Sequence, residues 1–151
     1  MQAKLIHRSD GQRTFAVVLG TGEEVVTALT ALADREALGA AKVTAIGAFS
    51  DAVLGYFDWQ AKDYRRIPVR QRVEVASFVG DIARGLDGKA SLHAHVVLGR
   101  HDATALAGHL FAGHVRPTLE VILTESPAHL RKRNDPESGL ALIDLGIQNR
   151  A

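Results

Sequence analysis

Hydrophobic residues recur at every second position over much of the chain, a spacing that is typical of half-buried β-strands. In residues 69–78, for example, valines occupy one side of the predicted strand and charged residues the other. Such alternation, or a short apolar run bounded by turn residues, is found in 15–19, 43–49, 52–59, 69–78, 82–84, 90–99, 106–116, 119–124 and 140–147. The pattern therefore predicts a chain built mainly from β-strands.

One segment instead shows the spacing of an α-helix. It follows Gly20-Thr21-Gly22 and opens with Glu23 and Glu24, two acidic residues that are favourable at the positive end of a helix dipole. The apolar positions with helical spacing are Val25, Leu29, Leu32 and Ala33. Gly39 should end the element, so we expect one helix between the first strand and the rest of the sheet.

Short turn signals separate the predicted strands. Ser50-Asp51 should join 43–49 to 52–59, and Asp87-Gly88 should form a hairpin turn, because Asp-Gly supplies the positive backbone angles that such a turn needs. Pro117 lacks the N–H of a strand ladder and should split 106–116 from 119–124. Strands that follow one another through short turns are usually antiparallel neighbours.

These elements predict an α+β fold with a largely antiparallel sheet and one principal helix. Nothing along the chain reads as a linker or a repeat, so residues 1–151 should form a single domain. The segment 125–134 is polar and basic, and 140–147 is apolar enough to return to the body as a last strand. We therefore expect 126–151 to be part of the same domain.

Composition narrows the functional classes. An apolar share of 46% and a charged share of 23% are those of a globular protein, not of a disordered one. The formal charge of +1 provides no general attraction to nucleic acid. The absence of cysteine excludes disulfides, thiolate nucleophiles and cysteine-bound metals. No stretch is long and apolar enough to span a bilayer, so we expect a cytoplasmic protein without membrane contact.

The most chemically informative residues are histidines. His93 and His95 are two apart in a predicted strand, so their side chains should project from the same face. His109 in the neighbouring predicted strand could supply a third nitrogen, and His101 could reach in from a loop. His114 is an odd number of residues from His109 and should face the other way. Three imidazoles with a fourth, open position form a typical zinc site.

A His-x-His pair also arises by chance in a chain of this length with seven histidines. The competing interpretation is one solvated histidine and one that makes a hydrogen bond in the core. An open zinc position would not by itself indicate an enzyme, since such sites also serve structure or bind small ligands.

Basic residues gather in one further stretch of the sequence. Arg65, Arg66, Arg70 and Arg72 could bind an anion or the phosphates of a nucleic acid. The competing interpretation is the solvated face of an edge strand, where charges discourage aggregation. A second basic run at 131–133 has the composition of a solvated loop.

Six short motifs occur in the order found in a known family. They are Ala45-Ile46-Gly47-Ala48-Phe49, Leu54-Gly55-Tyr56-Phe57-Asp58, Val73-Glu74-Val75-Ala76-Ser77-Phe78-Val79-Gly80-Asp81-Ile82, Leu92-His93-Ala94-His95, Gly108-His109-Leu110 and Thr118-Leu119-Glu120-Val121. Over about 13–125 the chain resembles the plant and prokaryote conserved (PPC) domain, in its stand-alone prokaryotic form. Two family glycines are replaced, by Ala103 and Ala107, and the Arg-Gly-Arg-Pro hook that reads the DNA minor groove in plant members is absent.

The resemblance implies a curled antiparallel sheet packed on one helix and a compact homotrimer. It places a metal, with zinc the usual suggestion, on His93, His95 and His109. Stand-alone members are commonly labelled as DNA-binding, and plant members contact other regulators. We therefore expect a non-enzymatic, zinc-binding homotrimer that acts as a DNA-associated or regulatory binding module.

The alternative is a zinc-dependent hydrolase or lyase that acts on a small substrate at the same three histidines. In that case Glu74, Glu120 or Asp102 would serve as the general base. The sequence does not select among these three carboxylates.

Overall fold

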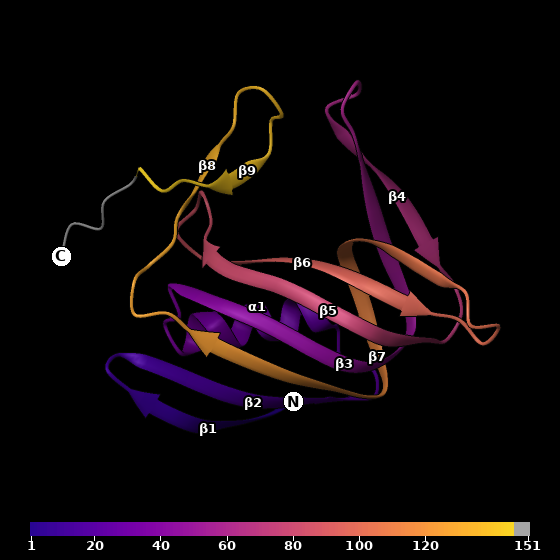
Figure 1. Ribbon diagram of the computed structural model, residues 1–151, viewed down its shortest axis with the longest axis horizontal. Helices are drawn as coiled ribbons and strands as arrows, with labels where there is room; N and C mark the ends of the chain where they lie inside the picture. The colour runs from indigo at the N-terminus through magenta and orange to yellow at the C-terminus, as the bar shows by residue number, and fades with distance from the viewer. Residues whose placement is uncertain (147–151) are drawn as a thin grey trace.

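The computed structural model describes residues 1–146, in which one helix and one large sheet make up the body (Figure 1). The elements are β1 (Gln2–Ser9), β2 (Gln12–Gly20), α1 (Val25–Arg35), β3 (Ala40–Asp58), β4 (Asp63–Val69), β5 (Val73–Arg84), β6 (Ala90–Gly99), β7 (Ala105–Glu125), β8 (Lys132–Asn134) and β9 (Ala141–Ile143). The predicted α+β class with an antiparallel sheet and one principal helix is confirmed. In these described residues no helix has the length and apolar character needed to cross a membrane.

The large sheet curls because β3 and β7 pair with each other as well as with their other neighbours. The strand order is β1-β2-β7-β6-β5-β3-β4, and the additional pairing of β7 with β3 closes β3, β5, β6 and β7 into a ring. All paired strands in this sheet are antiparallel. The strands β1–β2 and β4 extend from this ring as two open edges (Figure 1).

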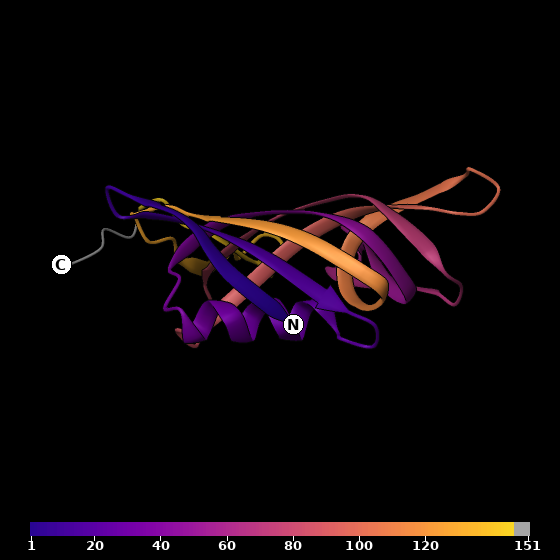
Figure 2. The same cartoon turned by 90° about the horizontal axis from the view of Figure 1, so that it is seen from below.

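Helix α1 covers one face of the curled sheet, which we call the inner face (Figure 2). Its apolar stripe is fully buried, as the helical spacing predicts, and it packs against β6 and β7. Glu24 forms the N-cap, because its carboxylate accepts the backbone N–H groups of Val26 and Thr27. The same carboxylate accepts the N–H of Gly113, so the cap also fastens the helix to β7.

The opposite face of the sheet, which we call the outer face, carries large apolar side chains in contact with solvent. Cross-strand partners place Ile122, Thr44, Val79 and His95 in one row across β7, β3, β5 and β6. Val79 is 54% exposed and Ile46, on the same face of β3, is 62% exposed. The outer face is therefore apolar but uncovered in the single chain.

Strand β3 is continuous, which corrects the prediction of two strands joined at Ser50-Asp51. The residues Ser50 and Asp51 stay in the strand, and the register against β7 shifts around them instead of reversing. Gly47 has a φ of +150°, and a Cβ there would lie 2.3 Å from the carbonyl oxygen of Thr118. A bulge thus bends β3 where the sequence indicated a turn.

Strand β7 is also continuous, although we predicted that Pro117 would split it. The register jumps from Leu119 opposite Gly47 to Val115 opposite Phe49, so Pro117 lies among extra residues of β7. The peptide bond between Arg116 and Pro117 is cis. Because no ladder hydrogen bond is needed at this irregularity, a proline is accommodated inside the strand.

The remaining differences concern the ends of the chain and the sheet edge. The sequence pattern missed β1, and it missed β4 because charged residues interrupt its apolar positions. The predicted strand 69–78 begins too early, since Val69 ends β4 and β5 starts at Val73. The predicted 140–147 strand contains β9, but β9 pairs only with β8 in a separate hairpin and not with the body. Residue 147 lies outside the described residues.

Candidate metal centre

The alternation of β6 places two histidines on the outer face. Ala94, Val96 and Leu98 are buried toward the helix, whereas His93 is half-buried and His95 is exposed. The two rings lie 5.3 Å apart between centroids. His93 and His95 therefore lie on the same face of β6, as the alternation of the sequence predicts.

Strand β7 brings His109 to the same place, because His109 is the direct cross-strand partner of His95. The ring of His109 stacks on that of His93 with centroids 5.3 Å apart and an interplanar angle of 30°. One ring nitrogen from each of the three histidines lies within 4.8 Å of the other two. Two adjacent strands thus gather three imidazoles into one cluster, which we call the histidine cluster (His93, His95 and His109).

The histidine cluster fits a metal ion in its donor chemistry. Ligands at about 2.0–2.1 Å from one tetrahedral ion lie about 3.3 Å from each other, so small side-chain rotations would close the cluster. Among the described residues, Nδ1 of His109 is buried without a hydrogen-bond partner. An unpaired buried nitrogen is costly, and a metal bound through Nδ1 of His109 would satisfy it. Three neutral nitrogens without thiolate or carboxylate ligands suit zinc.

An aspartate orients one of the three rings. Asp81 of β5 lies opposite His93, and its Oδ2 is 3.3 Å from Nδ1 of His93. A carboxylate at one ring nitrogen fixes the tautomer and leaves the other nitrogen free to bind a metal. Sequence reasoning missed this residue, because a tight turn at Asp87-Gly88 would pair Asp81 with Ala94, whereas the loop spans 85–89 and brings Asp81 opposite His93.

Aromatic side chains shield the cluster on its β4 side. The rings of Tyr64 and Phe111 lie 4.9 Å and 4.8 Å from that of His109, centroid to centroid. Gly55 is opposite His109 on β3, and a Cβ there would meet the Phe111 ring at 2.4 Å. The absence of a side chain at Gly55 therefore lets this aromatic wall close over His109.

The electrostatic environment keeps two of the histidines neutral. Burial lowers the pKa of His109 to about 4, and the positive charge that His93, His95, Lys132 and Arg66 carry in their protonated forms acts in the same direction. Burial, followed by the charge of His93, also lowers the pKa of His95. Because only a neutral imidazole binds a metal, His95 and His109 are in the binding form at neutral pH.

The low pKa of His109 should make the metal-free protein sensitive to acid. An unfolded histidine titrates near 6.5, so between that value and about 4 the unfolded chain takes up a proton that the folded chain excludes. Stability should therefore fall as the pH drops through this window, by about 1 kcal/mol at pH 5 after allowance for partial exposure. Chemical denaturation in chelator at pH 7.5 and pH 5 measures it.

The matched variants for this measurement are His109→Gln and His7→Gln, since His7 is exposed on β1. In His109→Gln the fall in the free energy of unfolding between pH 7.5 and pH 5 should be about 1 kcal/mol smaller than in the wild type. In His7→Gln the fall should be the same as in the wild type. Equal pH dependence in the wild type and in His109→Gln would show that His109 does not titrate in this way.

The structure leaves the other candidate histidines outside the cluster. His101 is exposed in the turn after β6, where it lines a pocket with Arg72 and Glu74. Nδ1 of His114 lies 2.8 Å from Oδ1 of Asp51 on β3, and both side chains are half-exposed.

The four arginines of the basic stretch do not share one surface. Arg65 and Arg66 are consecutive in β4 and therefore point to opposite faces of this edge strand. The guanidinium of Arg66 lies 4.0 Å from the centre of the Phe111 ring, beside the cluster. Arg72 forms a 3.0 Å ion pair with Glu74, and Arg70 is exposed in the connection to β5. Their predicted role in anion or nucleic-acid contact stays a prediction.

The curled sheet, its one helix and the three gathered histidines together place this chain among α+β proteins with a candidate metal site on the outer face. The chain belongs to the Plants and Prokaryotes Conserved (PCC) domain family, whose model matches residues 7–127. This is the family, also written PPC, that the sequence motifs indicate, so the resemblance is confirmed.

Solved structures of similar proteins agree with this assignment. A PPC protein of Pyrococcus horikoshii is 30% identical with a TM-score of 0.82, and the match covers 87% of this chain and 91% of that one. A metal-containing protein of Archaeoglobus fulgidus is 30% identical with a TM-score of 0.80, over 86% and 91% of the two chains. A Ralstonia eutropha protein named "putative DNA-binding protein" is 31% identical with a TM-score of 0.81, over 87% and 90%. No curated protein matches the chain.

Proposed function

We propose that this protein is a zinc-binding homotrimer that acts as a non-enzymatic binding module for a regulatory partner. The observation that carries the proposal is the histidine cluster, in which three ring nitrogens from two strands lie within 4.8 Å of each other. The Asp81 contact to His93 and the low pKa of His109 support it, because both favour metal binding. The metal-containing relative from Archaeoglobus fulgidus supports a metal in the family.

Metal content is the direct test. Protein purified without added metal and without a metal-binding tag should contain about one zinc per chain by elemental analysis, because three imidazoles bind zinc tightly at neutral pH. An anomalous signal between His93, His95 and His109 at the zinc edge should locate it. Absence of any metal at neutral pH, also after incubation with zinc, would contradict the proposal.

The trimer is supported by the apolar outer face. Ile46, Val79 and Ile122 are large, exposed and close together on adjacent strands. Exposed apolar patches of this kind mark protein contacts, since burial of each side chain contributes favourable free energy. A shallow pocket of about 430 Å³ lined by Ile46, Gly47 and Glu120 lies on the same face and offers a place for a side chain of another copy.

The charges favour a protein partner over direct binding to DNA. Arg72 is already paired with Glu74, and Arg65 and Arg66 point in opposite directions. Binding to DNA phosphates would show itself as a steep fall in affinity with salt, about −0.9 per phosphate contact in a log–log plot. A salt-insensitive interaction would agree with a protein partner.

The carboxylates considered for a hydrolase or lyase lie elsewhere. Glu74 is paired with Arg72, Glu120 lines the outer-face pocket, and Asp102 accepts hydrogen bonds from Thr104. None of these three residues lines the pocket beside the histidine cluster. The structure thus places none of these three carboxylates beside the histidine cluster.

A further inference from the structure

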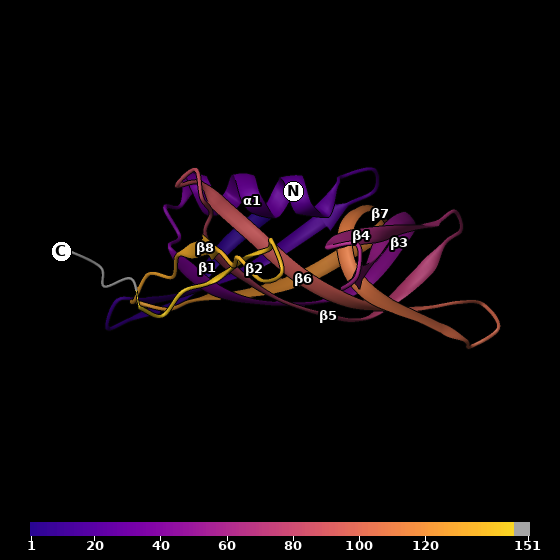
Figure 3. The same cartoon turned by 90° about the horizontal axis from the view of Figure 1, so that it is seen from above.

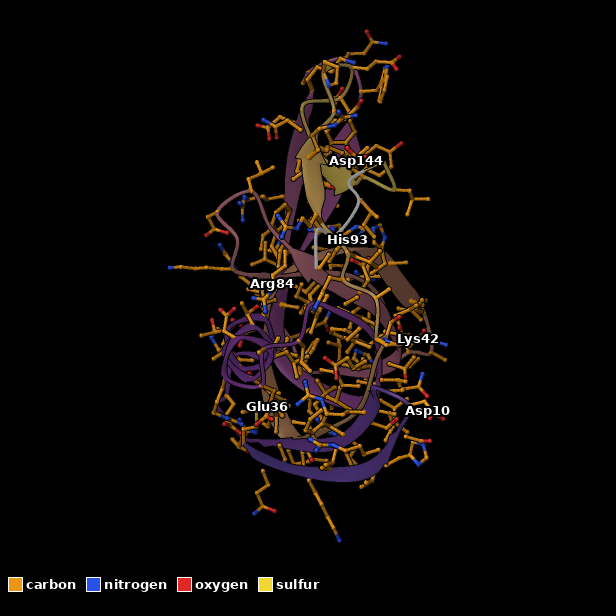
Figure 4. The ribbon with its side chains drawn as sticks, turned by 90° about the vertical axis from the view of Figure 1, so that its left-hand side faces the viewer. Asp10, Glu36, Lys42, Arg84, His93 and Asp144 are labelled. Carbon is orange, nitrogen blue, oxygen red and sulfur yellow. The ribbon has the colours of Figure 1, made fainter. Side chains whose placement is uncertain are left out.

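A pocket of about 570 Å³ opens beside the histidine cluster, between β6 and the β8–β9 hairpin. Figure 4 shows His93 between the body of the sheet and this hairpin, and Figure 3 shows the hairpin from above. The pocket is lined by Tyr64, Ser91, Leu92, His93, His109, Lys132, Leu140, Ala141, Leu142 and Ile143. The hairpin therefore forms one wall of this pocket, although it contributes no residue to the histidine cluster.

The one lysine of this lining is held in place and half-buried. Nζ of Lys132 donates a hydrogen bond to Oγ of Ser91 at 3.3 Å. Burial lowers the pKa of Lys132, against the opposite effect of the Asp81 carboxylate. A partly desolvated ammonium gains free energy when an anion joins it, because the anion replaces lost hydration.

The part of the pocket lining next to Lys132 is aliphatic, since Lys132 pairs directly with Ile143 in the hairpin. Leu140 is half-buried, while Leu142 and Ile143 of the hairpin are 45% and 39% exposed. Leu92 of β6 packs at the edge of the core beneath them. Such side chains would release water on contact with a short hydrocarbon tail, with about fourfold tighter binding for each buried methylene.

The charges around the pocket favour a negative ligand. Lys132 and Arg66 both act on His109 electrostatically, and Asp81 is the carboxylate that faces His93 and Lys132. Of the described residues that line the pocket, Lys132 carries the only permanent charge, and a divalent metal on the cluster would add to this positive charge.

We propose that this pocket binds a small aliphatic carboxylate, with Lys132 as the counter-ion and the hairpin side chains around the tail. The inference rests on the proposed metal site for part of its positive charge. It gives the binding module a ligand class: an organic acid with a short, preferably branched, hydrocarbon chain. A tail of this size would contact Leu142 and Ile143.

The test is calorimetric titration of the zinc-loaded protein with 3-methylbutanoate. The carboxylate should bind, and the neutral analogue 3-methylbutanamide should bind at least tenfold more weakly, because it lacks the charge that Lys132 recognises. Lys132→Met keeps the apolar stem and should weaken carboxylate binding at least tenfold. Lys62→Met is the matched control, since Lys62 is an exposed lysine stacked on Trp59.

Further variants and metal analysis separate the two proposals. Leu142→Ala should weaken 3-methylbutanoate much more than acetate, since acetate has no hydrocarbon chain that could contact Leu142. Zinc content measured on each variant should stay unchanged, because Lys132 and Leu142 are not in the histidine cluster. Equal binding by wild type and Lys132→Met, or no binding at all, overturns the pocket inference while the zinc proposal stands. If the wild type does not hold zinc, the metal proposal is overturned instead. Binding of 3-methylbutanoate that still depends on Lys132 in the zinc-free protein would then support the pocket inference on its own.

Discussion

Replacing His95 by alanine should abolish stoichiometric zinc binding, whereas replacing His114 by alanine should leave zinc in place. His95 is the central member of the histidine cluster, next to His93 on β6 and opposite His109 on β7. Removal of one of three nitrogens leaves two, which is too few for a stable zinc site in competition with water. His114 instead contacts Asp51 and is not part of the cluster.

Zinc content by elemental analysis and thermal unfolding should report the same contrast. A ligand that binds only the folded state adds about 2.7 kcal/mol of stability at a hundredfold excess over its Kd. Zinc should therefore stabilise the wild type and the His114→Ala variant and leave His95→Ala unchanged. Equal loss of zinc in both variants would mean that the metal does not sit between β6 and β7.

The second large effect concerns assembly. Light scattering at micromolar concentration should give three times the chain mass of 16.2 kDa. The change Ile46→Asp should yield monomers, because Ile46 lies on the apolar outer face and a buried unpaired carboxylate costs several kcal/mol. A monomeric wild type would exclude the trimer.

The control for this experiment is Leu86→Asp. Leu86 is 61% exposed, as Ile46 is, but it lies in the turn between β5 and β6 and not on the outer face. It should remain trimeric. Dissociation by Leu86→Asp with a trimeric Ile46→Asp would place the contact surface at the turn between β5 and β6 instead.

The sequence pattern was sufficient where the period was regular and the turn chemistry unambiguous. Helix α1 follows from its apolar stripe and acidic start, and β6 follows from alternation after Asp87-Gly88. The regular alternation in β6 also places His93 and His95 on one face. Their meeting with His109 required only that β6 and β7 be neighbours, which the intervening turn favours.

The pattern failed where the sheet bends. Register shifts in β3 and β7 interrupt the two-residue period, so one bent strand looks like two straight ones. Ser50-Asp51 and Pro117 are ordinary turn residues, and their place inside strands depends on bulges that tertiary pairing imposes. The prediction of edge strand β4 failed for another reason. An edge strand tolerates charged residues, and these conceal the alternation of apolar and polar positions in β4.

The surroundings of the histidine cluster were not predictable from local spacing. Lys132 comes from a hairpin that contacts β6 only through the tertiary fold, and Tyr64 comes from the edge strand. Both are distant from the histidines along the chain. The three ligating candidates, in contrast, come from two strands that follow each other.

The ring of strands β3, β5, β6 and β7 has a weak seam. Strands β6 and β7 share only the short register from His95 opposite His109 to Gly99 opposite Ala105, whereas β3 and β7 pair along most of their length. The histidine cluster lies at one end of this short pairing, where His95 is opposite His109. A metal there would link β6 to β7 across their short pairing and keep the ring closed. The curvature of the whole sheet would then depend on the supply of metal.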